Sequence, residues 1–370
     1  LKHIWGRTDL IPLWVADMDF ATAPFVTDAI RKRCENEVLG YTGKPDSYYN
    51  AIINWVKQRY DLVVAKEMIN FVPGIVPGIG MAMNCFTQKG DKVMIQPPVY
   101  HPFAWVTTRN ERTLVTNPLK WENGMYRMDL DAFRELIKGC KLFILCNPHN
   151  PGGVVWTEAE LRAIADICYD EKVLVFSDEI HADLTLPPHT HRPFATVSEK
   201  ARMNSVTFMS PSKAFNMPGL SASHALIFNE DLRKRFRIYM DAGELDMGHV
   251  FAFLSVEAAY SHGTEWLDQC LAYIQGNIDF VDEFLKKHAP KIKAIRPEAS
   301  YLVWLDCREL ELSQKDLNEF FVDKAHLALN DGEMFGKEGI GFMRLNVASP
   351  RCIIEKAMKQ LADAYQLYIK

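Results

Sequence analysis

One lysine, Lys213, occupies a position from which a side chain could carry covalent chemistry. It belongs to the segment Ser205-Val-Thr-Phe-Met-Ser-Pro-Ser-Lys-Ala-Phe-Asn-Met-Pro-Gly-Leu220, where a short β-type run ends in a hydroxyl-rich turn just before the lysine. Open α/β sheets bind their ligands just beyond such strand ends. Partial burial there lowers the pKa of an amine and frees its lone pair to form a Schiff base with a carbonyl compound. Taken alone, the segment is more typical of a surface lysine in a Ser/Pro loop, so the interpretation depends on its partners.

Polar residues follow the ends of several predicted strands. Strands are predicted at 92–96, 141–146, 172–177 and 206–209, and they alternate with helices, one of which (157–171) opens with a Thr-Glu-Ala-Glu capping box. This alternation is typical of an α/β sheet. The residues that follow the strands are Tyr100, Asn150, Asp178, His181, Ser210, Ser212 and Lys213. Because ligands of open α/β sheets bind at the carboxyl ends of the strands, we expect these side chains to converge on one rim.

A Gly/Pro loop before a predicted helix offers a place for an anion. In Phe71-Val-Pro-Gly-Ile-Val-Pro-Gly-Ile-Gly80, Pro77 suits the first turn of a helix. Free backbone N–H groups between Gly74 and Gly78, those of Ile75 and Val76 included, would bind an anionic group. Such loops are common, and the glycine spacing differs from the GxGxxG of nicotinamide sites.

Together these groups suit pyridoxal 5′-phosphate (PLP), an aromatic aldehyde phosphate, better than a metal ion or a nicotinamide. A lysine Schiff base and an acidic partner for the pyridinium nitrogen are the usual pair for this cofactor. In this interpretation Lys213 forms the Schiff base and Asp178 keeps the ring nitrogen protonated. The remaining roles are hydrogen bonds to the ring O3′ from Asn150 and His181, stacking on the ring by Tyr100, and phosphate binding by Ser210, Ser212 and the Gly74–Gly78 backbone.

Each assignment has a plainer alternative that the sequence leaves open. Asp178 could cap the turn after its strand, and Asn150 could be a turn residue between prolines. Tyr100 could belong to the core. The histidines at 181, 189 and 191 could indicate a metal site, but no carboxylate pattern supports it, and we expect no metal.

The bulk composition is that of a globular chain. Its 370 residues predict more than one domain, and 48% apolar with 24% charged residues is ordinary for such a chain. A net charge of −5 provides no basic surface for nucleic acid, and no apolar run approaches the roughly 20 residues that span a membrane. The eight cysteines form no CxxC pair and predict reduced, buried thiols in the cytoplasm. No signal-peptide pattern opens the chain, although a start at Leu1 leaves room for missing residues.

We expect three parts along the chain. Residues 1–40 would form an N-terminal arm and part of a small domain, 41–260 a large cofactor-binding domain, and 261–370 a small C-terminal domain. The segment from Ile11 to Phe20 carries two acids, so we expect it to lie across a site or a partner subunit. Further elements are predicted as helices at 24–38, 48–60, 232–240, 250–288, 314–324 and 350–370 and as strands at 223–228, 300–306 and 341–347.

Three segments carry a family resemblance. Cys-Asn-Pro-His-Asn-Pro-Gly-Gly153, Ser-Asp-Glu-Ile-His181 and Ser-Pro-Ser-Lys-Ala-Phe-Asn-Met-Pro-Gly-Leu220 resemble the PLP-binding motifs of fold type I class I/II aminotransferases. Their order and spacing match as well, and the similarity runs from Trp14 to Arg351. The resemblance implies an α/β fold whose large domain holds a mostly parallel seven-stranded sheet flanked by helices, with a smaller α+β domain beside it.

Other segments are similar to a narrower branch of that superfamily. Pro-Leu-Trp-Val-Ala-Asp-Met-Asp-Phe20, Pro-Pro-Val-Tyr-His-Pro-Phe103 and Asp-Glu-Ile-His-Ala-Asp-Leu184 resemble the cystathionine β-lyase branch, which contains cystalysin and the MalY/PatB-type C–S lyases. This resemblance implies α,β-elimination on L-cystathionine or cysteine S-conjugates, with a thiol, pyruvate and ammonia as products.

The resemblance also implies roles for residues outside the strand ends. Arg344, in Gly-Phe-Met-Arg-Leu-Asn346, matches the arginine that binds the substrate α-carboxylate, and the backbone near Ala16 would lie beside that carboxylate. The family forms homodimers in which a partner tyrosine reaches the phosphate, a role that falls on Tyr41. Two departures favour the lyase branch: Ser221 replaces the phosphate-binding arginine of typical aminotransferases, and His181 replaces a tyrosine. We have no physical account of a third departure, the Pro-Gly-Gly that follows Asn150.

Two alternatives to a lyase remain open from the sequence. An aminotransferase acting on an L-amino acid would use the same site but return the amino group to a keto acid. A regulatory binding protein would use the fold to contact a partner, although the sequence shows no separate DNA-binding module. The sequence does not identify the thioether substrate.

Overall fold

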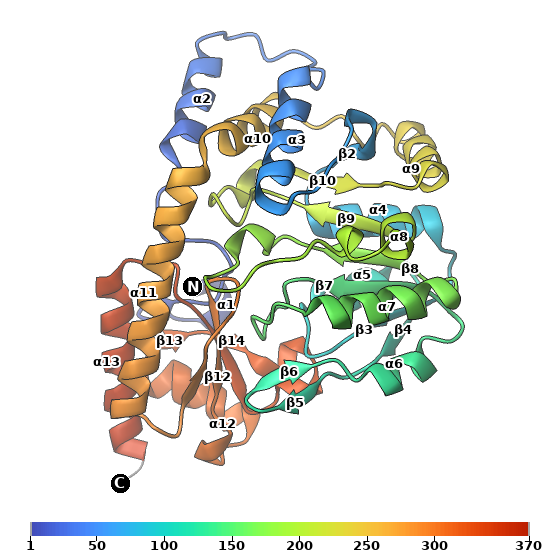
Figure 1. Cartoon of the computed structure of the whole chain (residues 1–370). Coiled ribbons are helices and arrows are strands. Elements are labelled where there is room, and N and C mark those ends of the chain that lie inside the picture. The colour runs from blue at the N-terminus through green and yellow to red at the C-terminus, as the bar shows by residue number, and fades with distance from the viewer. Residues whose placement is uncertain (1, 369–370) are drawn as a thin grey trace.

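The central element is a seven-stranded sheet, which Figure 1 shows with helices on both of its faces. This computed structural model describes residues 2–368. The strand order is β2-β10-β9-β8-β7-β3-β4, and every neighbouring pair is parallel except those that involve β10. The strands are β2 (Ile69–Val72), β10 (Ser223–Leu226), β9 (Ser205–Met209), β8 (Leu174–Asp178), β7 (Cys140–Cys146), β3 (Lys92–Ile95) and β4 (Thr113–Thr116). The predicted mostly parallel seven-stranded sheet is therefore confirmed.

Alternating side chains of the central strands enter two separate apolar cores. Along β7, Phe143 and Leu145 face one core, while Leu142 and Ile144 face the other. Both faces are therefore buried, as expected for parallel strands. The first core packs against α6 (Leu130–Leu136), α7 (Glu158–Asp170) and α8 (Glu199–Met203). The second packs against α4 (Ile75–Phe86), α5 (Pro102–Arg109) and α9 (Glu230–Ala242).

The second sheet belongs to the C-terminal part of the chain. It has four antiparallel strands in the order β11-β12-β15-β14, and the long α11 lies beside α13 next to it (Figure 1). Its elements are β11 (Lys293–Ile295), β12 (Leu302–Asp306), β14 (Asn330–Asp331), β15 (Phe342–Asn346), α11 (Thr264–His288), α12 (Gln314–Glu319) and α13 (Arg351–Tyr368). This arrangement supports the proposed small domain, whose boundaries at 40 and 261 stay a prediction.

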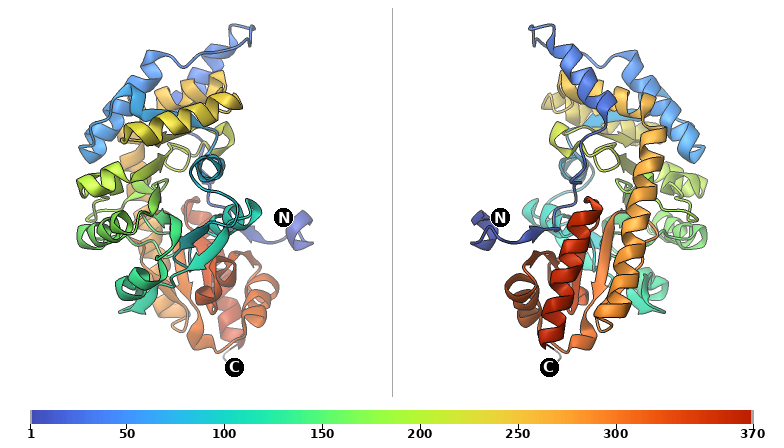
Figure 2. Two further views of the ribbon diagram at one scale, coloured as in Figure 1. Left: turned by 90° about the vertical axis from the view of Figure 1, so that its right-hand side faces the viewer. Right: turned by 90° about the vertical axis from the view of Figure 1, so that its left-hand side faces the viewer.

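The N-terminal segment connects these parts. After α1 (Lys2–Trp5), β1 (Ile11–Pro12) pairs in parallel with β13 (Leu327–Ala328), and the chain then crosses the lysine loop. The helices α2 (Pro24–Cys34), α3 (Asp46–Tyr60) and α10 (Val250–His262) follow as one packed group. Figure 2 shows the loop between α2 and α3 projecting at the top of the molecule.

Several elements differ from the predictions. The predicted helix 24–38 ends at Cys34, and the region 250–288 is two helices separated at Gly263. A Cβ at Gly263 would lie 2.3 Å from both the Ala259 carbonyl oxygen and the Phe215 ring, so this close approach requires glycine. The helix predicted at 314–324 continues as a π-helical turn after Glu319. Strands β2, β4 and the hairpin β5 (Lys120–Glu122)–β6 (Met125–Arg127) were not predicted.

Two further predictions concern the cysteines and the helix starts. All eight cysteines are free thiols, but Cys34 and Cys352 are exposed and Cys85 is only partly buried, so the prediction of buried thiols is wrong for these three. The predicted capping box is confirmed, because Thr157 accepts from the Glu160 N–H and Glu160 accepts from the Thr157 N–H. Within residues 2–368, no helix is both long and apolar enough to span a membrane.

Candidate active site

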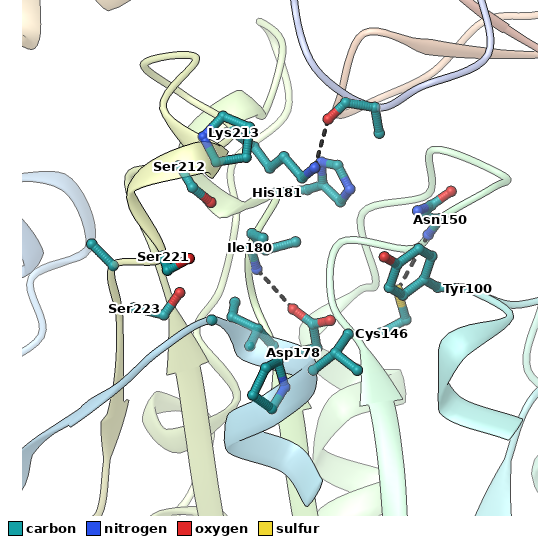
Figure 3. A pocket seen from close by; sticks show the side chains of 17 residues that line it. Tyr100, Cys146, Asn150, Asp178, Ile180, His181, Ser212, Lys213, Ser221 and Ser223 are labelled. Atoms are coloured by element: carbon teal, nitrogen blue, oxygen red, sulfur yellow. Dashed lines mark hydrogen bonds between the residues drawn. The ribbon is translucent and has the colours of Figure 1, made fainter. Parts of the chain in front are cut away.

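A pocket opens where the C-terminal ends of β7, β8 and β9 meet the first turn of α4 (Figure 3). The structure brings most of the predicted site residues together there. Those that line it are Ala16, Ile75, Val76, Tyr100, Asn150, Asp178, His181, Ser212 and Lys213. Ser210, Arg344 and Tyr41 are not among its lining residues. Strand-end geometry therefore accounts for the pocket, and the three exceptions need separate explanations.

Lys213 is partly buried and lies beneath the N-terminal arm. Its Nζ donates a hydrogen bond of 2.6 Å to the backbone carbonyl of Ala16. Burial, followed by the positive charge of Arg344, lowers the pKa of Lys213, whereas Asp17 and Asp178 oppose this shift. The surroundings therefore make the neutral amine, which is the nucleophilic and basic form, more accessible than in an exposed lysine.

Asp178 is buried at the end of β8. One of its carboxylate oxygens accepts a 3.1 Å hydrogen bond from the Ile180 N–H. Burial, with a smaller contribution from the neighbouring Glu179, raises the pKa of Asp178 to about 7, against the Ile180 hydrogen bond and the charge of Lys213. A buried carboxylate with so few donors gains most from a cationic partner inside the pocket.

A second buried carboxylate, that of Glu179, holds the turn that follows β8. Glu179 accepts from the Ser177 hydroxyl and the Phe194 N–H, both at 2.8 Å, and its other oxygen lies 2.7 Å from His191 Nε2. Three partners satisfy the Glu179 charge, so it holds the turn after β8 in place. Asp178 lacks such a set and is left to face the pocket.

His181 is buried in its neutral form. Burial, together with the positive charges of Lys213 and Arg344, lowers its pKa to about 3. Its Nδ1 is buried without a hydrogen-bond partner. Such an orphaned ring nitrogen is costly unless a bound group satisfies it. Across residues 2–368, no three or more histidine, cysteine, aspartate or glutamate side chains are grouped to hold a metal ion.

Arg344 reaches the pocket through Asn150. It lies on β15 of the small sheet, and its Nη1 donates a 3.0 Å hydrogen bond to the side-chain oxygen of Asn150. Its Nη2 donates to the Trp14 carbonyl at 3.0 Å and to Asn330 at 2.5 Å. Burial lowers the pKa of Arg344 to about 10, and its Nε is buried without a partner. The guanidinium thus retains a donor that a ligand could use.

The opposite end of the pocket is suited to an anion. Gly74, with φ of +120°, precedes α4, so the N–H groups of Ile75 and Val76 lie in the first helical turn, where they lack intrahelical acceptors. Gly78 allows α4 to approach the sheet, because a Cβ there would lie 2.8 Å from Val72 Cγ2. Figure 3 shows the Ser212 side chain on the same side of the pocket.

Of the two serines predicted to bind the phosphate, Ser212 lines the pocket and Ser210 does not. The Ser210 hydroxyl donates to the Ala222 carbonyl at 2.7 Å and accepts from the Ser212 N–H at 3.1 Å. It therefore shapes the lysine loop. Ser221 and Ser223, which were not predicted, do line the pocket (Figure 3). Ser221 could have been found, because it occupies the position of an arginine in the resembling family.

The two predicted tyrosines lie in different environments. Tyr100 lines the pocket, and its ring meets the Phe103 ring edge-on at 5.6 Å. Burial and the Asp178 charge raise the pKa of Tyr100. Tyr41 is 98% exposed in the loop between α2 and α3 and does not line the pocket of its own chain.

Comparisons with known proteins show the family to which the chain belongs. The aminotransferase class I and II family matches residues 8–361. The chain is 38% identical to cystathionine β-lyase PatB of Bacillus subtilis, over 98% of this chain and 94% of that protein. It superposes on cystalysin from Treponema denticola, a structure that contains pyridoxal 5′-phosphate, with a TM-score of 0.95 and 34% identity over 98% and 93% of the two chains. For a PLP-bound C–S lyase from Staphylococcus hominis the TM-score is 0.90, with 35% identity over 96% and 92%.

The raised pKa of Asp178 predicts how the stability of the ligand-free protein depends on pH. Because the pKa is about 7 in the fold and near 3.8 in the unfolded chain, the folded protein binds more protons between these values, and its stability falls as pH rises through 7. At about pH 8, Asp178→Asn should have a larger free energy of unfolding than the native protein, on the order of 1 kcal/mol for each unit by which burial raises the pKa of Asp178. Its unfolding temperature should therefore be higher. The difference should shrink toward pH 5.

Thermal unfolding of the ligand-free proteins at both pH values measures this effect. Asp241→Asn provides the matched control, because Asp241 is exposed on α9 and its replacement should leave the pH dependence unchanged. If the stability of the native protein and that of Asp178→Asn depend on pH in the same way, burial does not raise the pKa of Asp178.

Proposed function

We propose that this chain, which belongs to the aminotransferase class I and II family, is a PLP-dependent carbon–sulfur lyase. Its reaction is the α,β-elimination of L-cystathionine or related cysteine S-conjugates to a thiol, pyruvate and ammonia. The observation that carries this proposal is the pocket that holds the partly buried Lys213 amine and the buried Asp178 carboxyl, each with one hydrogen bond. The lyase names of the relatives support the choice of branch.

The residues present fit PLP at each of its polar groups. The first turn of α4 and the hydroxyls of Ser212, Ser221 and Ser223 are suited to the phosphate. Asp178 is suited to a protonated ring nitrogen. His181, whose Nδ1 has no hydrogen-bond partner, and Asn150 both line the pocket and are suited to the phenolic oxygen.

Bound PLP supplies an electron-withdrawing ring that stabilises negative charge at the substrate Cα. The rest of the reaction falls to the side chains of the chain itself. Lys213, whose pKa is lowered, removes the Cα proton as a neutral amine. Asp178 holds the proton on the ring nitrogen through a charge-assisted hydrogen bond. The arm over Lys213 limits the access of water to the amine.

Arg344 is the residue proposed to bind the substrate α-carboxylate. Its guanidinium is held by Asn150, Asn330 and the Trp14 carbonyl, while Nε remains without a partner. These bonds fix the planar group before the ligand arrives, which reduces the entropy lost on binding. The backbone of Ala16, two residues after Trp14, lies at the same side of the pocket.

The activity is tested with purified protein, PLP and L-cystathionine. We expect release of homocysteine, pyruvate and ammonia, together with the visible absorbance of lysine-bound PLP. Lys213→Ala should lose both, whereas the exposed Lys234→Ala should keep both. Absorbance without thiol release, combined with turnover that requires a keto acid, would instead identify an aminotransferase. Turnover by Lys213→Ala would refute the site.

Arg344→Lys separates substrate binding from chemistry. Lysine keeps the charge but loses the planar, bidentate geometry, so KM for L-cystathionine should rise by about 10- to 150-fold, corresponding to about 1.5–3 kcal/mol for a charged hydrogen bond. The PLP absorbance should persist, because Arg344 is not among the residues proposed to hold PLP. Arg308→Lys, at an exposed ion pair with Asp306, is the control. An unchanged KM would exclude Arg344 as the carboxylate ligand.

We also propose a homodimer in the cytoplasm, in which Tyr41 of one chain reaches the phosphate of the other. The exposure of Tyr41 on a projecting loop supports this arrangement, and the free cysteines are consistent with a reducing compartment. Sedimentation should show a mass of two chains, and Tyr41→Ala should weaken PLP affinity about tenfold or more. Tyr169→Ala, at another exposed tyrosine, should leave the affinity unchanged. A monomer with native PLP affinity would contradict the proposal.

A further inference from the structure

The N-terminal arm crosses the lysine loop without regular secondary structure, yet most of its carbonyls are bound. Its backbone from residue 13 to 20 receives donors from both sides. From β15, Asn346 N–H donates to Leu13, Arg344 to Trp14, and Asn346 Nδ2 to Val15 and Asp17 at 2.6 Å each. From the lysine loop, Asn216 Nδ2 donates to Met18 and Phe20. Such a segment has a fixed conformation despite its irregular path.

The Ala16 carbonyl is the group of the arm that contacts the Lys213 amine. It accepts from Lys213 Nζ at 2.6 Å and from the Tyr301 hydroxyl at 2.9 Å. A carbonyl oxygen has two lone pairs, so these two donors occupy both. Tyr301 is fully buried immediately before β12, and its ring lies 6.5 Å from that of His181. Its hydroxyl therefore fixes the acceptor that holds the lysine.

We propose that Tyr301 is a positioning residue that acts on Lys213 through the Ala16 carbonyl. This inference rests on the proposed role of Lys213. With one N–H bound to Ala16, the amine directs its lone pair into the pocket, toward an aldehyde carbon or a Cα proton. An ammonium would leave further N–H groups without acceptors in a partly buried place. The Ala16 oxygen is also a weaker acceptor for it, because the Tyr301 hydroxyl occupies one of the two lone pairs. Both features favour the neutral form.

The surroundings of the amine are consistent with control by so few contacts. Arg344 from β15, Asp17 from the arm, and Asp178 and His181 from the end of β8 are the titratable groups that face it. Because the effects of these charges on the pKa of Lys213 partly offset each other, no single ion pair dominates that pKa. A change in the hydrogen bond to Ala16 should therefore have a measurable effect on it. Loss of the Tyr301 hydroxyl leaves the carbonyl a stronger acceptor for Lys213 alone and lets it tilt. Both effects favour the ammonium and misdirect the lone pair.

Tyr301→Phe removes the hydroxyl and keeps the ring. Tyr48→Phe is the matched control, because Tyr48 is equally buried but its hydroxyl has no hydrogen-bond partner. The first measurement uses the full chain freed of cofactor and follows PLP capture by absorbance between about pH 6 and 9. In this step the amine nitrogen attacks the aldehyde carbon, a C=N bond forms and water leaves. Tyr301→Phe should slow capture at neutral pH about two- to tenfold and move its pH midpoint upward.

The second measurement uses the PLP-loaded protein and L-alanine, which has no group to lose from Cβ. Exchange of the Cα proton in D₂O should slow by a similar factor in Tyr301→Phe at unchanged KM, because Arg344 is untouched. Asn346→Ser removes the hydrogen bonds to the Val15 and Asp17 carbonyls on either side of Ala16, so it should also slow capture and exchange. This variant replaces Tyr301→Phe in both measurements if Tyr301→Phe proves unstable.

The outcomes distinguish this inference from the proposed function. If Tyr301→Phe and Asn346→Ser match Tyr48→Phe in capture and in exchange, Tyr301 has only a packing role and the inference is wrong. If the native protein itself captures no PLP, the proposed function fails instead.

Discussion

The structure depends on the burial of opposite charges that are only partly neutralised. Lys213, Asp178 and Arg344 each lie in or beside the pocket with fewer partners than buried charges usually have. Burial therefore shifts their pKa values in the direction that favours the neutral form of each group, downward for the two bases and upward for the acid. The rest of the fold must hold these groups where water cannot restore their usual pKa values, and perturbed groups gathered in a cleft are characteristic of catalytic sites.

The sheet positions these groups, and the N-terminal arm covers them. The parallel strands deliver Asp178 and the lysine loop to one edge, which is a consequence of apolar runs buried on both faces. The arm then closes that edge with backbone carbonyls in place of side chains. Because both Arg344 and Lys213 donate to carbonyls two residues apart on this arm, a shift of the small sheet would move both functional groups together.

The sequence was sufficient for the parts of the site that depend on local patterns. Asp178 is the last residue of β8, and Asn150 and Lys213 lie in the loops just after β7 and β9, so strand polarity predicts their convergence. It was insufficient where side-chain direction decides the role, because Ser210 turns toward Ala222 whereas Ser223, at the start of β10, lines the pocket. Long-range contacts were also beyond it. The bond between Asn150 and Arg344 joins residues 194 positions apart, and only family resemblance pointed to Arg344.

Electrostatic coupling between Arg344 and Lys213 gives the proposed reaction an order. The guanidinium charge contributes to the lowered pKa of the lysine, so in the empty site it makes the neutral amine needed for attack on a carbonyl more accessible. A substrate carboxylate bound to Arg344 would neutralise that charge and raise the proton affinity of Lys213. The same amine would then be a stronger base at the moment when a Cα proton lies within reach. Nucleophile and base can thus be one residue, because the substrate itself changes the field in which that residue works.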